Sequence, residues 1–449
     1  MSTTLRWMLL CLVILLAALV AQIEFFAYAV WALLAIFLVS QVMGRVALRG
    51  LAIERHCNKR QAEIGEAATV TLEVKNDKPL PVPWIVVEDL IPRRLRADGE
   101  RSLAVLMLPF RTRKLQYRLA LRHRGYHQVG PLVLESGDFF GLVRRFQRDP
   151  AMSFVTVLPR IVPIGRWSIA SRKPIGEVLV QSGLHEDPTR VCGVRPYMRG
   201  DPLNRIHWKA TARTARLHSR VYEHSTLIGA NVVLDFSETA WREANCDPPP
   251  GPAPFPPPPE SEQDEAWFLA SELAVTVAGS IAAFVVEEKQ RVGLITNGGD
   301  AAERVEWEMT ARAAETRDEA RLMAMEQRVV SRLRPVQVPP QKGPAHMARI
   351  LETLAHLELR EGLSCADMIS NEYESWPREA SLLVIVPALP ADLVAQLARL
   401  RSAGFIITVF VIRNQEEYLV GRARLAAEHI GVIHVRDDRD LDQVAVPRT

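Results

Sequence analysis

The chain has 449 residues, of which 48% are hydrophobic, and its mean hydropathy of +0.02 is high for a soluble protein. This length accommodates two or three domains. The net charge of +3 is uninformative by itself, and we expect no nucleic-acid partner. The five cysteines are scattered, odd in number and without Cys-x-x-Cys spacing, which argues against a zinc site or a disulfide framework.

Two apolar runs stand at the N-terminus, Trp7 to Ala21 and Phe25 to Val39, separated by Gln22 and Glu24. With its flanks, each run approaches the ~20 residues that a membrane span needs. We therefore predict a hairpin of two transmembrane helices in residues 1–45. The alternative is a cleaved signal peptide ending near Ala21 and followed by one span. Glu24 and the second run favour the hairpin.

Basic residues flank this hairpin, and they predict its orientation. The flanking cations are Arg6 before it and Arg45, Arg49, Arg55, Lys59 and Arg60 after it. Because basic flanks stay on the cytoplasmic side, we expect the body of the protein in the cytoplasm.

Residues 46–165 predict a small antiparallel β-sandwich. Short strand-like patterns are punctuated by Pro, Gly and Asp at 69–75, 84–88, 115–121 and 154–158. Turns at Gly130-Pro131 and Gly137-Asp138 bracket a further strand. Phe139 and Phe140, which follow the second turn, are expected to be buried and purely structural.

Residues 230–449 change to an alternation of strands and helices. Strands are expected at 231–236, 291–296, 381–386, 405–412 and 430–435, and helices at 266–288, 300–333, 345–360, 391–403 and 415–428. This rhythm predicts a mostly parallel sheet with helices on both faces. Nine prolines in residues 248–259 predict an exposed loop at 247–260, either an insertion or a docking ligand.

The connecting segment 166–229 contains the most distinctive stretch of the chain. Gly200 predicts a turn, and Asp201 followed by Pro202 predicts a helix start. Arg205, Lys209 and Arg213 are four residues apart and therefore share a face of that helix. The face either docks an acidic partner, a phosphate or lipid headgroups, or is a solvated surface that joins the domains.

A second motif, Asp235-Phe-Ser-Glu-Thr239, follows a predicted buried strand. Asp235, Ser237 and Thr239 can aim three oxygens at a hard cation such as Mg²⁺. The motif resembles the metal-ion-dependent adhesion site of von Willebrand factor A-type domains, which opens D-x-S-x-S. A remote carboxylate is hard to place, because Val386–Pro390 has none. The alternative is an Asp that caps the next turn.

The motifs of common enzymes are missing. The sequence has no G-x-x-x-x-G-K-[ST], no H-E-x-x-H and no G-x-S-x-G. His207, His218 and His224 flank the basic segment without a fixed carboxylate or thiol partner. We therefore expect no enzymatic activity.

Two long motifs together identify a family. They are Arg124-Gly … Gly130-Pro … Gly137-Asp-Phe-Phe-Gly-Leu142 and Arg195-Pro-Tyr-Met-Arg-Gly-Asp … Arg205-Ile-His-Trp-Lys-Ala-Thr-Ala-Arg213. They resemble the bacterial family called domain of unknown function 58, whose pattern is close to R-G … G-P … D-P-F-G-L and R-x-Y-x-x-G-D-x-x-R-x-I-x-W-x-A-x-A-R. Phe139 replaces the usual Pro. The resemblance implies a von Willebrand A-like C-terminal domain.

The resemblance also implies a function. Such proteins are commonly encoded beside MoxR-type AAA+ ATPases and other membrane or von Willebrand A-type proteins. We therefore expect a non-enzymatic scaffold or adaptor in the bacterial inner membrane, assembling or activating other proteins. The binding residues carried over from the signature are Arg195, Tyr197, Gly200, Asp201, Arg205, His207, Trp208, Lys209 and Arg213.

Two alternatives remain open beside the adaptor. One is a cation-dependent protein-binding module that uses the partial site at Asp235, with a client's carboxylate completing the coordination. The other is a cell-envelope hydrolase, against which the expected cytoplasmic orientation and the missing nucleophile count.

Overall fold

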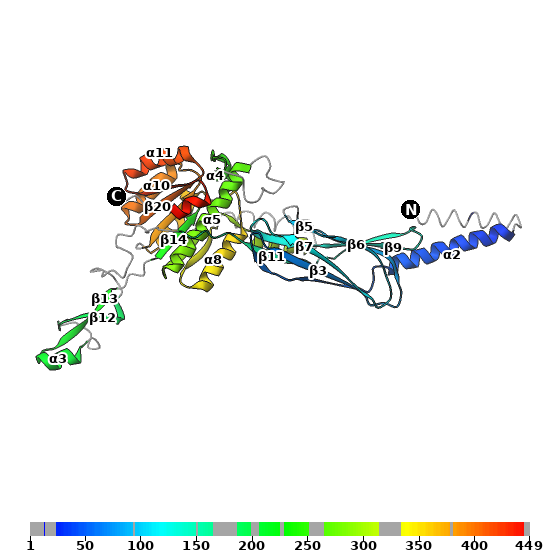
Figure 1. Ribbon diagram of the computed structural model, residues 1–449, viewed down its shortest axis with the longest axis horizontal. Helices are drawn as coiled ribbons and strands as arrows, with labels where there is room; N and C mark the ends of the chain where they lie inside the picture. Colours follow the sequence, from blue (N-terminus) through cyan, green and yellow to red (C-terminus); the bar gives the residue numbers. More distant parts are fainter. Residues whose placement is uncertain are drawn as a thin grey trace. The chain divides into compact units, whose positions relative to one another are not determined.

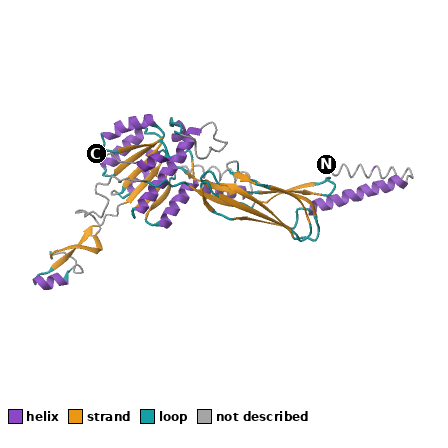
Figure 2. Ribbon diagram, viewed as in Figure 1, coloured by secondary structure: helices purple, strands orange, loops and turns teal. Residues whose placement is uncertain are grey.

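The computed structural model describes residues 13, 24–92, 95–149, 151–164, 186–198, 206–224, 229–250, 265–313, 334–377 and 380–443. The chain divides into two compact units, Met1–Leu158 and Pro159–Thr449. Figure 1 labels the elements of both units, and Figure 2 distinguishes their helices from their strands.

The first unit consists of one long helix followed by strands. The elements are α2 (Glu24–Val46), β1 (Leu51–Cys57), β2 (Gln61–Glu63), β3 (Ala67–Asn76), β4 (Val82–Asp89), β5 (Arg96–Asp98), β6 (Ser102–Met107), β7 (Thr112–Ala120), β8 (Gly125–Val129), β9 (Leu132–Gly137), β10 (Arg144–Asp149) and β11 (Ser153–Leu158). Helix α2 ends against the strands, where the Lys78 ammonium donates to the carbonyls of Val46, Ala47 and Arg49. A cation thus binds carbonyls at the last residue of the helix and just after it, where the negative end of the helix dipole lies.

The strands of this unit form three sheets, in the orders β1-β3-β7-β5, β10-β9-β4-β6 and β2-β11-β8. The pairings are antiparallel, except that β2 and β11 run parallel. Side chains alternate in burial along β3, with Val70, Leu72 and Val74 fully buried. This period of two places one face of each strand in a shared core.

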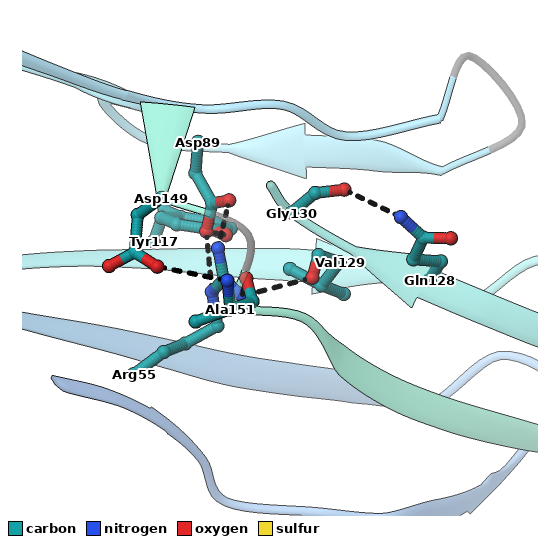
Figure 3. Close-up of polar contacts among 8 residues, drawn as sticks. All are labelled: Arg55, Asp89, Tyr117, Gln128, Val129, Gly130, Asp149 and Ala151. Atoms are coloured by element: carbon teal, nitrogen blue, oxygen red, sulfur yellow. Dashed lines mark hydrogen bonds and ion pairs between the residues drawn. The ribbon is translucent and has the colours of Figure 1, made fainter. Parts of the chain in front are cut away.

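A buried ion pair joins two of these sheets (Figure 3). Arg55 of β1 donates from Nε and Nη2 to both carboxylate oxygens of Asp89 in β4, at 3.1 and 2.7 Å. The Tyr117 hydroxyl of β7 donates to the same carboxylate at 2.6 Å. Arg55 Nη1 also donates to the carbonyls of Val129 and Ala151. Burial and the neighbouring Asp89 raise the pKa of Tyr117, so its hydroxyl keeps the donated proton.

The second unit is built largely around a six-stranded sheet. Its elements are β12 (Glu186–Pro196), α3 (Trp208–Thr214), β13 (His218–His224), β14 (Gly229–Leu234), α4 (Glu238–Glu243), α5 (Glu265–Glu287), β15 (Arg291–Thr296), β16 (Gly299–Asp300), α6 (Ala301–Ala313), β17 (Val336–Gln341), α8 (Pro344–His356), β18 (Leu357–Glu358), α9 (Cys365–Glu372), η3 (Tyr373–Ser375), β19 (Ser381–Val386), α10 (Ala391–Ser402), β20 (Ile406–Ile412), α11 (Gln415–Ala426), β21 (Gly431–Val435) and η4 (Asp438–Gln443).

The six strands lie in the order β17-β15-β14-β19-β20-β21. Helices α5 and α8 pack on one face, in a core with Val232, Leu234 and Phe410. Helices α9, α10 and α11 pack on the other face, in a core with Val384 and Val409. Because both faces are covered, the central strands are apolar at almost every position.

The fold class expected from the sequence was wrong. A transmembrane hairpin, one small antiparallel sandwich and a mostly parallel sheet were expected. The described strands instead form six sheets with mostly antiparallel pairings, and the largest sheet is mixed because β17 runs antiparallel to β15. The pattern of hydropathy contains no information on strand direction. Strand β17 was missed because Pro339 and Pro340 interrupt it. Proline has no backbone N–H to donate to a neighbouring strand, so it occurs mainly in strands at the edge of a sheet.

The described residues also contain no N-terminal pair of apolar helices. The first predicted run, Trp7–Ala21, lies outside the described residues except for Val13. In the described part of the chain, one helix is long and apolar enough to cross a membrane, Ala266–Glu287 within α5, and 72% of its apolar window is buried in the structure. Such burial is typical of a core helix.

The expected burial of Phe139 and Phe140 was wrong, since they are 60% and 57% exposed. Asp138 takes the buried position instead. Its carboxylate accepts from the backbone N–H of Phe140 at 3.0 Å and of Val143 at 2.7 Å, which closes the turn between β9 and β10. The two rings therefore project from a turn that a buried carboxylate holds in shape.

Candidate functional site

The signature segment forms a hairpin of β12 and β13 with α3 in the connection between them. β12 and β13 pair antiparallel with two register irregularities, and Ile206 bridges to Ser219. Helix α3 begins at Trp208, where the ring Nδ1 of His207 accepts from the backbone N–H of Ala210 at 3.0 Å. His207 is therefore the N-cap of α3, and three residues of the predicted site, Gly200, Asp201 and Arg205, lie outside the described residues.

Helix α3 buries none of its side chains. Lys209 and Arg213 are exposed four residues apart, so they share a face as predicted from their spacing. Trp208 beside them is 67% exposed. Arg195 and Tyr197 are half-buried in and after β12, and the backbone N–H of Tyr197 donates to the carbonyl of Leu217.

Besides Trp208, the hairpin exposes other large apolar side chains. Val194, Met198 and Leu217 are each more than two-fifths exposed. The hairpin thus combines a large aromatic ring with cations and aliphatic side chains. The centres of protein–protein interfaces have a similar composition, because Trp and Arg are enriched there. The hairpin can therefore bind a partner. The Thr214 hydroxyl lies 3.1 Å from the ring Nδ1 of His218 and also donates to the backbone carbonyl of Ala210.

The second site lies where β14 ends. In the sheet β14 lies between β15 and β19, and the chain runs from β14 to β15 on one side and later returns to β19 on the other. Ligands of open α/β sheets bind at the carboxyl ends of the strands flanking such a reversal. Asp235 follows β14 at this point, and its backbone N–H donates to the carbonyl of Ile385.

Asn297, which the sequence reasoning missed, organises this site. Its side-chain Nδ2 donates to Asp235 Oδ1 at 2.9 Å, while its Oδ1 accepts from the backbone N–H of Phe236 at 2.6 Å. The same Nδ2 donates to the carbonyl of Leu363. Asn297 comes directly after β15, and a polar residue at the end of the neighbouring parallel strand was a signal that could have found it.

Asp235 is only 4% exposed, and burial raises the pKa of its carboxyl above the ordinary value. The hydrogen bonds from Asn297 and from the backbone N–H of Ser237 lower the pKa and offset part of that rise. Ser237 is buried at the N-terminus of α4 without a side-chain capping bond, and Thr239 is exposed two residues further on.

These residues fit a magnesium ion only in part. Asp235 and Ser237, two residues apart, offer one carboxylate and one hydroxyl, which are oxygen ligands of the kind that Mg²⁺ prefers. Within the described ranges, no three His, Cys, Asp or Glu side chains gather as a metal-binding group. Any ion here would therefore need further oxygens from water or from a partner.

Comparisons with known proteins found an uncharacterized relative but no family model. No family model matches the chain. An uncharacterized protein of Bacillus subtilis, YeaD, is 25% identical over 251 residues, which is 53% of this chain and 62% of that protein. The chain thus matches less than two thirds of this relative's length.

Solved structures resemble small parts of the chain. The CARDB domain of PF1109 from Pyrococcus furiosus matches 24% of this chain and 91% of its own at 17% identity, with a TM-score of 0.18. Native alpha-2-macroglobulin from Escherichia coli matches 27% of this chain and 20% of its own, also at 17% identity, with a TM-score of 0.21.

Proposed function

We propose that this protein is a non-enzymatic, membrane-anchored adaptor that works with a MoxR-type AAA+ ATPase to assemble or activate other proteins. The observation that carries the proposal is the hairpin of β12, α3 and β13, where exposed Trp208 lies next to Lys209 in a helix that also exposes Arg213. Trp208 serves as the apolar anchor of the docking surface, and the cations select a partner with an acidic patch.

The membrane anchor belongs to the same proposal. Helix α2 exposes large apolar side chains along its length, including Tyr28, Trp31, Leu33 and Leu38, each more than half exposed. Lipid is the surrounding that makes such a surface favourable. We therefore assign α2 as the anchor in a bacterial inner membrane, and the cations after α2 keep the body in the cytoplasm.

Co-purification from detergent with and without ATP tests the adaptor function. The docking variant is Lys209→Glu with Arg213→Glu, compared with wild type. Charge reversal turns attraction to an acidic patch into repulsion, so recovery of the ATPase should fall by at least about tenfold, since two reversed contacts cost more than 1.4 kcal/mol.

A matched control reverses two exposed arginines in the last turns of other helices, Arg399→Glu with Arg424→Glu. This control should recover the ATPase as wild type does. Equal recovery by the docking variant, in protein that melts at the wild-type temperature, would refute the docking surface.

A second candidate function is cation-dependent binding of a client at Asp235. The observation in its favour is that a buried carboxylate accepts hydrogen bonds from neutral donors, an amide and a backbone N–H. A divalent ion held by Asp235, Ser237 and Thr239 would supply the missing positive charge. The client's carboxylate would then complete the coordination.

Titration with Mg²⁺ separates this function from the first. An ion that binds only the folded protein raises its melting temperature by mass action, and Asp235→Asn should abolish that rise. If Mg²⁺ changes neither the melting temperature nor client binding of wild type, the cation model fails and the adaptor model stands.

A further inference from the structure

The exposed apolar side chains of the β-strand region gather in three turns. These turns are residues 77–81 between β3 and β4, 108–111 between β6 and β7, and 138–143 between β9 and β10. Their large apolar side chains, all at least half exposed, are Leu80, Leu108, Phe110, Phe139, Phe140 and Leu142. We call these six residues the apolar collar.

Strand register places the three turns at one end of the unit. Lys75 pairs with Thr112, Val82 with Met107, and Arg144 with Gly137, so each turn closes beside the next. Asn76 ties two of them together, because its side-chain Nδ2 donates to the carbonyls of Leu80 and Leu108 at 3.0 and 3.1 Å.

The distribution of apolar exposure between the two ends is uneven. Among the described residues of the strands and turns, Leu90 is the one large, exposed apolar side chain at the opposite end, and it is 39% exposed. Two others, Leu106 and Phe146, lie within three residues of the collar turns. Exposed apolar side chains concentrated at one place on a protein mark a surface that contacts a membrane or another molecule.

Helix α2 leaves the unit at the collar end. A Cβ atom added at Gly44 would lie 2.5 Å from Val143 Cγ1, so the helix packs directly on the turn that carries Phe139 and Phe140. Lys78, in the turn that carries Leu80, binds the carbonyls of Val46, the last residue of α2, and of Ala47, which follows it. Any bilayer that surrounds α2 therefore meets the collar.

Local structure holds the aromatic rings of the collar outward. Asp138 is fully buried, and its carboxylate fixes the backbone of Phe140 and Val143. The indole Nε1 of Trp84 donates to the carbonyl of Asp138 at 3.0 Å. Phe110 has a φ of 55°, a left-handed conformation that is unfavourable for a bulky residue and is retained here at the turn tip.

Cations outnumber carboxylates around the collar, where Asp77 pairs with Lys75 and Glu135 with Arg144. Exposed arginines stand beside it at the end of α2, at the start of β7 and at the start of β10, namely Arg45, Arg49, Arg111, Arg144 and Arg145. Aromatic rings and cations at one level are the composition of a surface that rests in the headgroup region of an anionic bilayer.

We propose that the apolar collar inserts into the interfacial region of the leaflet from which α2 emerges and holds the β-strand unit against the membrane. This inference rests on the anchor role of α2 proposed above. Lipid is the occupant because the collar surrounds the exit of an apolar helix and is ringed by cations that match anionic headgroups.

Photo-cross-linking tests both claims separately on the full native chain. The protein is reconstituted into vesicles of phosphatidylcholine and phosphatidylglycerol that contain a phospholipid with a diazirine in its acyl chain. We expect cross-linked lipid on α2 and on all three collar turns. Cross-links on α2 without any on the turns would overturn the collar and leave the anchor intact, whereas their absence from α2 would overturn the anchor.

A variant pair sharpens the test. Phe110→Glu with Phe140→Glu should abolish lipid cross-links in the turns and retain them on α2, while Leu90→Glu at the opposite end should retain both. Particle mass in detergent gives a second measurement. A dimer that the double variant converts to monomers would show that a second copy covers the collar, and would overturn the lipid assignment.

Discussion

The buried pair of Arg55 and Asp89 gives the sharpest stability prediction, for the substitution Arg55→Met. The side chains of the pair are 3% and 0% exposed. Methionine fills much of the same volume but leaves the Asp89 carboxylate with the Tyr117 hydroxyl as its remaining partner. Removing one member of a buried pair costs about 3–5 kcal/mol, because the other charge stays buried. For a unit of this size that lowers the melting temperature by about 6–20 °C.

Thermal unfolding of the full chain, followed by intrinsic fluorescence, measures this loss. Arg118→Met is the matched control, because Arg118 is exposed on β7 and its replacement should change stability by less than about 0.5 kcal/mol. The double variant Arg55→Met with Asp89→Leu should be more stable than Arg55→Met, since it removes the stranded charge. If the melting temperature of Arg55→Met equals that of the Arg118→Met control, the ion pair does not stabilise the packing of the two sheets.

Three further predictions concern single positions. Burial raises the pKa of the Asp138 carboxyl, but hydrogen bonds from backbone N–H groups, the strongest from Val143, outweigh burial and lower this pKa below 3.8. The ionised carboxylate therefore contributes its full stabilisation of the folded protein above pH 3.8. That stabilisation is lost as the pH falls through the lowered pKa. The difference in melting temperature between wild type and Asp138→Asn should therefore narrow in acid, and a constant difference would contradict this. Gly137→Ala places a Cβ 2.2 Å from the Val143 carbonyl oxygen and should cost about 1–3 kcal/mol, whereas Gly431→Ala meets nothing within 4 Å and should be neutral in the same unfolding assay. Trp208→Ala should leave the melting temperature within about 1 °C, because the ring is mostly exposed, and a larger loss would assign Trp208 to the core instead of to a docking surface.

Continuous apolar strands and amphipathic helices could be located from the sequence. The predicted strand 381–386 has the bounds of β19, and the predicted helix 391–403 differs from α10 by one residue at its end. These segments carry their own signal, because each must bury either both faces of a strand or one stripe of a helix. Strand direction and sheet order depend on distant partners and therefore could not be inferred.

The candidate sites show the same limit. The shared face of Lys209 and Arg213 followed from their spacing, but the start of α3 at Trp208 did not, because His207 provides the cap through a ring nitrogen. Phe139 was expected in the core because it is apolar. A buried carboxylate in the preceding position reversed that outcome, and no hydropathy pattern contains such a contact.

The central claim is that the hairpin docks an ATPase, and the most direct measurement is recovery of that ATPase with the full chain in detergent in the presence of ATP. Wild type and the Arg399→Glu, Arg424→Glu control should recover it equally, and Lys209→Glu with Arg213→Glu should lose it. Undiminished recovery by a folded hairpin variant, or no ATPase with wild type, would contradict the account.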